Sequence, residues 1–168
     1  LFESLVKNSL TVLADEPDDS TAMVWSEAEA FAEMESSEKA IYKLDLIDKE
    51  VLLEDVEDLL TYEGFHKVKE LWLDKNEFKD EGVEVLAQSS QIKNLMVLSL
   101  AHNKLSNYSA QALAASPFLG HLQKLFLQSN RIGLEGLKAL TESPVLANLQ
   151  LLYLNLNPEG PAGAGTLG

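Results

Sequence analysis

Four asparagines stand 27 residues apart, and each closes the same phrase, Leu-x-Leu-x-x-Asn. They are Asn76, Asn103, Asn130 and Asn157. A unit of this length has room for one short strand, a turn and a helix, and it buries its apolar side only when neighbouring units stack on it. The spacing therefore predicts an α/β solenoid whose stability is shared among its repeats.

Within each unit, leucines alternate with other residues, so we expect the leucines to face the interior and the residues between them to face outward. Each asparagine is expected to hydrogen-bond backbone groups in the turn after its strand, since buried polar atoms need partners. Gly82, Gly136 and Gly163 share one position in the unit, which favours a backbone turn or a close approach before each helix. Short helices are predicted over residues 83–86, 110–113 and 137–140.

A fifth, degenerate copy of the unit precedes the other four. Ile41, Leu44 and Leu46 fit the apolar positions, but Lys49 replaces the asparagine. We interpret this copy as the first repeat. The prediction is thus about five repeats over residues 41–168, the last of them incomplete.

Residues 1–40 lack the repeat, and we expect them to form an acidic, helical N-terminal cap. Apolar residues from Phe2 through Leu10 to Leu13 lie near helical spacing, and residues 24–34 indicate a second helix. Trp25 and Phe31 are expected to anchor this pair on the first repeat, although a peptide-binding role is the alternative. Because the chain lacks an initiating methionine and stops one residue after Leu167, we expect it to be a fragment or a partly ordered chain.

The unit Leu-x-x-Leu-x-Leu-x-x-Asn-x-Leu/Ile-x-x-x-Gly-x-x-x-Leu resembles the ribonuclease-inhibitor-like class of leucine-rich repeats. The stretches Ala-Leu-Ala-Ala-Ser-Pro-Phe-Leu (112–119) and Ala-Leu-Thr-Glu-Ser-Pro-Val-Leu (139–146) are similar to bacterial members, in which Ser-Pro ends the helix. Over residues 41–168 the resemblance implies a right-handed α/β solenoid, whose curved sheet lines a concave surface that binds protein. It does not select a function, because the class includes inhibitors, GTPase activators, immune sensors and bacterial effectors.

Charge is distributed unevenly along a chain whose net charge is −14. Residues 1–90 hold 24 acidic and 8 basic side chains, whereas residues 91–168 hold 3 and 5. An acidic surface repels nucleic acid and anionic membranes, and it steers a basic protein toward the first half of the chain. The alternative is that most of these charges are solvated helix faces.

The position between the two leucines of each strand carries three aromatic residues on the outward side. Successive repeats place Asp45, Trp72, Ser99, Phe126 and Tyr153 there, about 4.8 Å apart across the sheet. We expect a partner-binding surface, with apolar residues bordered by polar ones, as in protein interfaces. Its predicted members are Trp72, Val97, Ser99, Phe126, Leu151, Tyr153, Asp45, Asp74 and His102. Two alternatives stay open: the rings stack only to stabilise the sheet, or they meet a second copy of the chain.

Catalysis, metals and cofactors find little support. His66, His102 and His121 fall at different positions in the repeat, so stacking does not assemble them into a site. Asp45, Asp48 and Asp74 are the weak candidates for sharing a cation, without a calcium-loop spacing. We therefore expect no catalytic residue, no metal and no cofactor. The chain has no cysteine, and extracellular repeats often carry disulfide-bonded caps, so we expect a cytoplasmic location.

Together these observations predict a protein-recognition module that binds a protein or peptide with apolar and basic residues. A regulator that covers the basic active site of an enzyme, as inhibitor or activator, is the second interpretation. A structural subunit of a larger assembly is the third.

Overall fold

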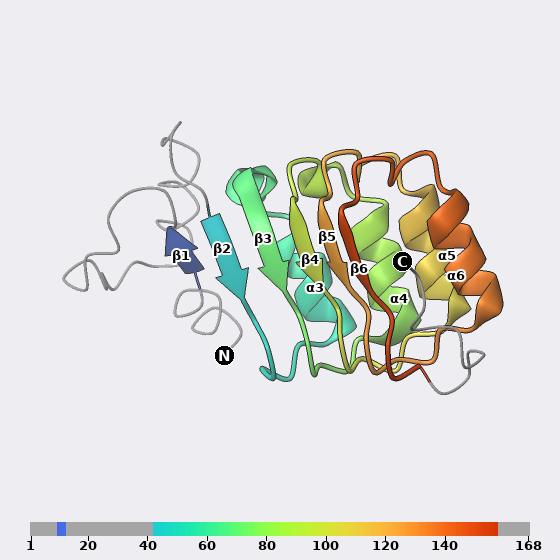
Figure 1. The fold of residues 1–168 in the computed structure, drawn as a ribbon. Helices are drawn as coiled ribbons and strands as arrows, with labels where there is room; N and C mark the ends of the chain where they lie inside the picture. Colours follow the sequence, from blue (N-terminus) through green and yellow to red (C-terminus); the bar gives the residue numbers. More distant parts are fainter. Residues whose placement is uncertain (1–9, 13–41, 158–168) are drawn as a thin grey trace.

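The computed structural model describes residues 10–12 and 42–157 of the chain (Figure 1). Strands and helices alternate along this part. In chain order they are β1 (Leu10–Val12), β2 (Tyr42–Asp45), α3 (Leu53–Leu59), the 3-10 helix η2 (Glu63–Lys67), β3 (Val68–Trp72), α4 (Lys79–Ala87), the 3-10 helix η3 (Ser90–Ile92), β4 (Val97–Ser99), α5 (Asn107–Ala115), β5 (Lys124–Phe126), α6 (Leu134–Glu142) and β6 (Leu151–Tyr153).

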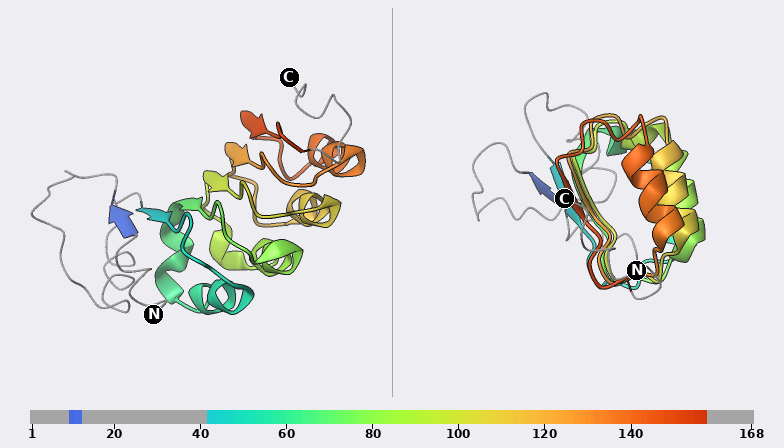
Figure 2. Two further views of the ribbon diagram at one scale, coloured as in Figure 1. Left: turned by 90° about the horizontal axis from the view of Figure 1, so that it is seen from below. Right: turned by 45° about the vertical axis from the view of Figure 1, so that its right-hand side comes forward.

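The strands form a six-stranded sheet in the order of the sequence, and β2 to β6 are parallel. The parallel pairs join residues 27 positions apart, except Tyr42 and Val68, where the register shifts. Leu71, for example, lies beside Leu98, and Leu98 beside Leu125. Figures 1 and 2 show that α3 to α6 all cover the same face of the sheet. The described residues thus form an α/β repeat fold, as the sequence predicts, and the opposite side of β2 to β6 is a helix-free face.

The repeated leucines form the core between the sheet and the helices. Leu44, Leu71, Leu98 and Leu125 make one fully buried row across the strands, and Leu46, Leu73, Leu100 and Leu127 make a second. Each buried side chain of this size contributes roughly 1.5–3 kcal/mol relative to an exposed one. The predicted inward direction of the leucines is confirmed at these positions.

The asparagines join consecutive turns, and Asn103 illustrates the pattern. Its Oδ1 accepts the backbone N–H of Asn76 (2.8 Å), while its Nδ2 donates to the carbonyl oxygens of Leu73 (2.9 Å) and Ala101 (3.1 Å). Asn103 is fully buried. The sequence prediction of an asparagine that satisfies backbone groups in the turn is confirmed.

Asn76 also serves the first repeat, which has no asparagine of its own. Its Oδ1 accepts the backbone N–H groups of Lys49 (3.1 Å) and Val51 (3.0 Å). The bonds therefore run from each repeat back to the one before it. This direction explains why the first repeat tolerates Lys49.

The residue before each asparagine, and before Lys49, has a left-handed backbone. The φ angles are 54° at Asp48, 59° at Lys75, 58° at His102, 58° at Ser129 and 61° at Leu156. None of these residues is glycine, which is the usual sign of such a conformation in a sequence. The asparagine bonds hold the turn in this shape.

The helices α5 and α6 end directly before the two Ser-Pro pairs, as the sequence predicts. Ser116 Oγ donates to the carbonyl of Ala87 (2.6 Å), and Ser143 Oγ donates to that of Ala114 (2.5 Å), so each serine also binds the preceding repeat. Proline cannot continue the helix because it lacks an N–H group.

Gly82 and Gly136 lie inside α4 and α6, so the prediction of a turn before each helix is wrong for them. Close approach is the reason for glycine at both positions. A Cβ atom on Gly82 would lie 2.6 Å from Phe78, and one on Gly136 would lie 2.7 Å from Asn107 Oδ1. Gly163 lies outside the described residues.

The structure describes one short segment of the predicted N-terminal cap, and this segment is a strand where the sequence predicts a helix. Leu10–Val12 forms β1, which pairs antiparallel with β2, so no helix runs through Leu10. The apolar residues Leu10 and Val12 alternate around Thr11, and the edge of β2 offers backbone groups to a pairing strand. The other residues of the predicted cap, including Trp25 and Phe31, lie outside the described residues.

Candidate functional site

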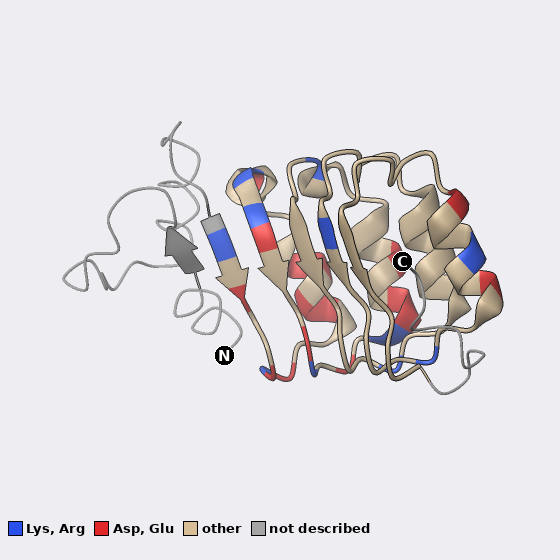
Figure 3. Cartoon of the chain, viewed as in Figure 1, with Lys and Arg blue, Asp and Glu red and all other residues tan. Residues whose placement is uncertain are grey.

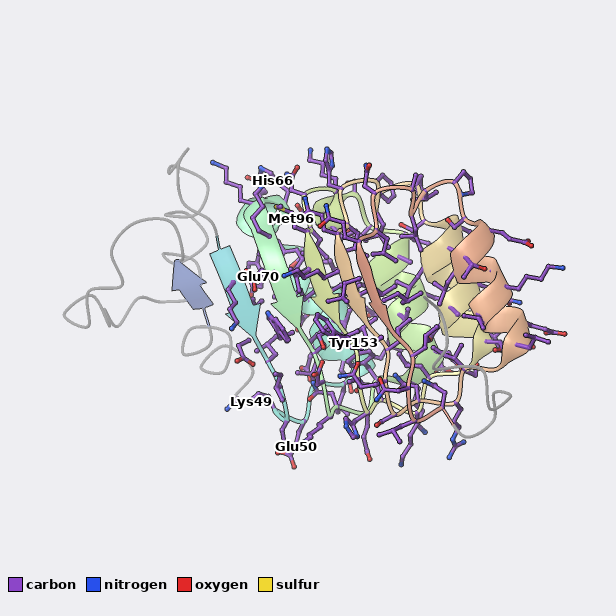
Figure 4. The ribbon with its side chains drawn as sticks, viewed as in Figure 1. Lys49, Glu50, His66, Glu70, Met96 and Tyr153 are labelled. Atoms are coloured by element: carbon purple, nitrogen blue, oxygen red, sulfur yellow. The ribbon has the colours of Figure 1, made fainter. Side chains whose placement is uncertain are left out.

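The helix-free face displays the outward residues of five parallel strands. Figure 4 shows Glu70 and Tyr153 on the strands themselves, whereas Lys49 and Glu50 lie at the edge where the strands end. His66 and Met96 lie at the opposite edge. Side chains from distant parts of the chain thus meet on the strands, away from the loops.

Three rings on this face form a continuous stack, which we call the aromatic row (Trp72, Phe126 and Tyr153). The centroids of Trp72 and Phe126 are 5.5 Å apart with an interplanar angle of 29°, and those of Phe126 and Tyr153 are 5.2 Å apart at 26°. Tyr153 is 45% exposed, and the other two rings are half-buried. The structure therefore brings together the three predicted aromatic residues.

Ser99 is a correction to the prediction. It pairs with Trp72 on one side and Phe126 on the other, yet its exposed fraction is 0%, so a partner does not reach it directly. Strands two apart in a sheet are roughly 10 Å from each other, so the neighbouring rings lean together over this small side chain. The Ser99 hydroxyl donates to Asp74 Oδ1.

Trp72 is held from three directions. Besides Phe126, its indole N–H donates to Glu70 Oε1 (3.2 Å), and Lys43 Nζ lies over its ring, 5.1 Å from the centroid. Lys43 and Glu70 are partners in the register of β2 and β3. The sequence shows both residues in the outward column, but their contacts with Trp72 depend on side-chain directions that the repeat pattern does not specify.

Asp74 is a half-buried carboxylate beside the aromatic row. Burial raises the pKa of Asp74, and the hydrogen bonds from Ser99 Oγ and from the backbone N–H of Ala101 (3.3 Å) offset only part of this effect. The nearby charge of His102 lowers the pKa of Asp74, whereas that of Asp45 raises it. These effects place Asp45, Asp74 and His102 in one electrostatic neighbourhood.

The remaining predicted residues surround the row. Val97 and Leu151 are half-buried, and the exposed Lys124 lies between them in the register of the strands, so the apolar strip is interrupted there. His102 is exposed in the turn after β4. Asp45, in register with Trp72, accepts the backbone N–H of Ile47 (3.1 Å).

The histidines and carboxylates of the described part do not assemble into a metal centre. His66 Nδ1 contacts the carbonyl of Glu63 (2.6 Å), and His121 Nδ1 contacts that of Lys93 (3.0 Å). Within residues 43–157, no three histidine, aspartate or glutamate side chains form a group that could hold a metal ion. Asp45, Asp48 and Asp74, the weak candidates for sharing a cation, therefore do not form such a group.

Two segments of the chain, residues 66–87 and 121–140, match the family model described as Leucine Rich repeat. The first segment spans β3 and α4, and the second spans β5 and most of α6. The chain contains leucine-rich repeats. No curated protein matches it significantly.

Leucine-rich repeat domains generally mediate protein–protein interactions, and they are typically binding modules without enzymatic activity. Repeat proteins of this kind present extended surfaces to their partners. Across the described residues, none of the helices has both the length and the hydrophobicity that a membrane crossing requires.

One further set of contacts in the leucine-rich repeats was not anticipated from the sequence. Asp80 accepts hydrogen bonds from Ser106 Oγ (2.7 Å) and Ser109 Oγ (2.5 Å), and Asn107 Oδ1 accepts the N–H of Gly136 (3.0 Å) in the next helix. Burial acts to raise the pKa of Asp80, but the hydrogen bonds from Ser106 and Ser109 outweigh burial and lower the pKa. The sequence signal that could have indicated these contacts is the 27-residue spacing of Asp80 and Asn107, which places both at the same position of the repeat.

Proposed function

We propose that the protein is a recognition module whose helix-free face binds a protein or peptide bearing apolar and basic residues. The supporting observation is the aromatic row, which spans β3 to β6 and ends in the exposed ring of Tyr153. The proposal makes this face the concave side of a curved solenoid of the ribonuclease-inhibitor-like class.

The aromatic row has the physical properties of a binding anchor. Stacked pairs are stabilised by about 0.5–1.5 kcal/mol beyond their buried area, so the rings are ordered before a partner arrives. A preorganised surface loses less side-chain entropy on association. Aromatic side chains are also enriched among the residues that dominate binding energy.

The charges beside the row favour a basic partner. Figure 3 shows acidic residues at the ends of β2 and β3, whereas β4 to β6 carry few charges. Asp45 and Asp74 lie at the Trp72 end of the row. The partner's basic residues would therefore lie toward β2 and β3, and its apolar residues toward Tyr153.

Site-specific crosslinking tests the proposal. A photoreactive amino acid replaces Tyr153 in one variant and Tyr108 in another; Tyr108 is 71% exposed but lies on α5, on the helix-covered side of the sheet. We expect a partner protein to be captured from position 153 and not from position 108. Equal capture at both positions, or capture at 108 alone, would contradict the proposal.

Two alternatives give different results in the same experiment. A second copy of this chain captured at position 153 would show self-association instead of a separate partner. If position 153 captures nothing, the stacked rings serve to stabilise the sheet. Both results argue against the proposed recognition of a separate partner.

A further inference from the structure

We propose that the Trp72 end of the aromatic row binds an arginine side chain of the partner, and that Lys43 occupies this place until the partner displaces it. The inference rests on the proposed function, because it concerns the same helix-free face. It adds the chemical class of the side chain that is recognised there.

Trp72 contacts a different kind of side chain on each of its two sides. Phe126, on β5, stacks on the ring, and Lys43, on β2, places its ammonium 5.1 Å from the ring centroid. β2 and β5 lie on opposite sides of β3 in the sheet. The contact with Lys43 shows that this side of the indole accepts a cation, as the negative face of an aromatic ring does.

Among the described residues, Lys43 lies over the ring of Trp72 but forms no ion pair with a carboxylate. Although Lys43 and Glu70 are partners in the strand register, the ion pair present among the described residues joins Lys104 to Glu77 (3.6 Å) instead. The lysine ammonium is a compact, strongly hydrated charge on a flexible stem. Such a group exchanges readily for a better-fitting cation.

Two carboxylates near Trp72, those of Asp45 and Asp74, form no ion pair within the described part of the chain, although the charge of His102 acts on Asp74. Asp45 is in register with Trp72 on the neighbouring strand, and Asp74 follows two residues later on the same face. A guanidinium is planar and stacks on a ring, while its fork of N–H groups binds a carboxylate through two hydrogen bonds. Arginine therefore fits both features of the site, whereas lysine fits one at a time.

The proposal is tested with a small cation and the indole N–H signals of the protein. The chain has two tryptophans, so its spectrum contains two indole signals, and Trp25→Phe assigns that of Trp72. N-acetyl-arginine methylamide is titrated into the protein in parallel with N-acetyl-citrulline methylamide, which has nearly the same shape without the charge. We expect the arginine compound to shift the Trp72 signal in a saturable manner and the citrulline compound to leave it in place.

Displacement of Lys43 is tested with Lys43→Gln, and Lys124→Gln is the matched control. Both substitutions remove one positive charge from the same outward column of the helix-free face, but only Lys43 contacts Trp72. We expect Lys43→Gln to tighten binding of the arginine compound about 3-fold or more beyond the effect of Lys124→Gln.

Equal tightening by both variants would overturn the displacement of Lys43, and equal shifts with arginine and citrulline would overturn recognition of the cation. The comparison of the two compounds in the unsubstituted protein does not depend on how either variant folds. Failure of these titrations together with capture of a partner at position 153 would refute the arginine site and leave the proposed function standing.

Discussion

The rings of Trp72 and Phe126 stack at 5.5 Å although the strand that carries Ser99 runs between them. Ser99 is small and fully buried beneath them. The size of this one residue therefore allows the aromatic row to be continuous across β4.

Replacing Ser99 with leucine should separate the two rings. Overpacking a buried site typically costs about 1–3 kcal/mol, and the substitution also removes the donor to Asp74. We expect a lower melting temperature and a weaker near-ultraviolet circular dichroism signal from the aromatic row. Ser90→Leu, at an exposed position on η3, is the control and should leave both unchanged; similar spectra for the two variants would contradict the stacking argument.

Asn103→Ala should destabilise the protein strongly. The change leaves the buried N–H of Asn76 without its partner, and an unsatisfied group of this kind costs about 1–3 kcal/mol. It also removes one donor each from the carbonyl groups of Leu73 and Ala101, which keep the donors Asn76 Nδ2 and Lys75 N. Urea denaturation should show a loss of about 2 kcal/mol or more. Asn155 is exposed, so Asn155→Ala should change stability by less than about 0.5 kcal/mol; equal losses would show that the buried asparagines are not special.

Gly136→Ala should destabilise the protein although alanine is normally the better helix former. The new methyl group would meet Asn107 Oδ1 and Ile132 Cγ2, each at 2.7 Å. We expect a loss of about 1–3 kcal/mol in chemical denaturation. A Cβ atom on Gly120 meets nothing within 4 Å, so Gly120→Ala is the control. An unchanged or raised stability of Gly136→Ala would disprove the close approach.

Asp74 and Asp80 should give opposite changes of stability with pH. Because the pKa of Asp74 is raised in the folded protein, its contribution to stability is complete below the ordinary aspartate pKa of about 4 and is lost as the pH rises through the folded value. As the pH rises from 3 to 7, the free energy of unfolding of Asp74→Asn should therefore increase relative to that of the unsubstituted protein.

The pKa of Asp80 is lowered, so its contribution is present above pH 4 and is lost as the pH falls. Asp80→Asn should therefore be less stable than the unsubstituted protein at pH 7, and the difference should shrink toward pH 3. Urea denaturation across this range checks both variants. Parallel pH dependences of the two would contradict the assigned electrostatics.

The sequence predicts the repeat fold well because its leucines and asparagines have the same structural role in every repeat. Leu98 and Asn103 recur at fixed positions of the repeat. The spacing alone therefore indicates that Leu98 is buried and that Asn103 forms hydrogen bonds in the turn. The left-handed backbone at His102 was not predictable, because it depends on bonds from the next asparagine and not on a glycine.

The candidate site was predictable in its strand positions but not in its side-chain contacts. Alternation placed Trp72, Phe126 and Tyr153 in one column, and the structure shows them stacked. The burial of Ser99 and the position of Lys43 follow from the directions in which large neighbours lean. Such directions depend on neighbouring strands, which the pattern within a single repeat does not encode.

The central claim is that the partner binds the helix-free face, and the affinity of the purified partner for two tyrosine variants tests it most directly. Tyr153→Ala removes the exposed ring at the end of the aromatic row, whereas Tyr108→Ala removes an exposed ring from α5. Isothermal titration calorimetry should show a loss of about tenfold or more for Tyr153→Ala, since truncating an interface anchor typically costs more than 1 kcal/mol. Tyr108→Ala should bind as tightly as the unsubstituted protein. Unchanged affinity in Tyr153→Ala, with its fold intact, would contradict the account.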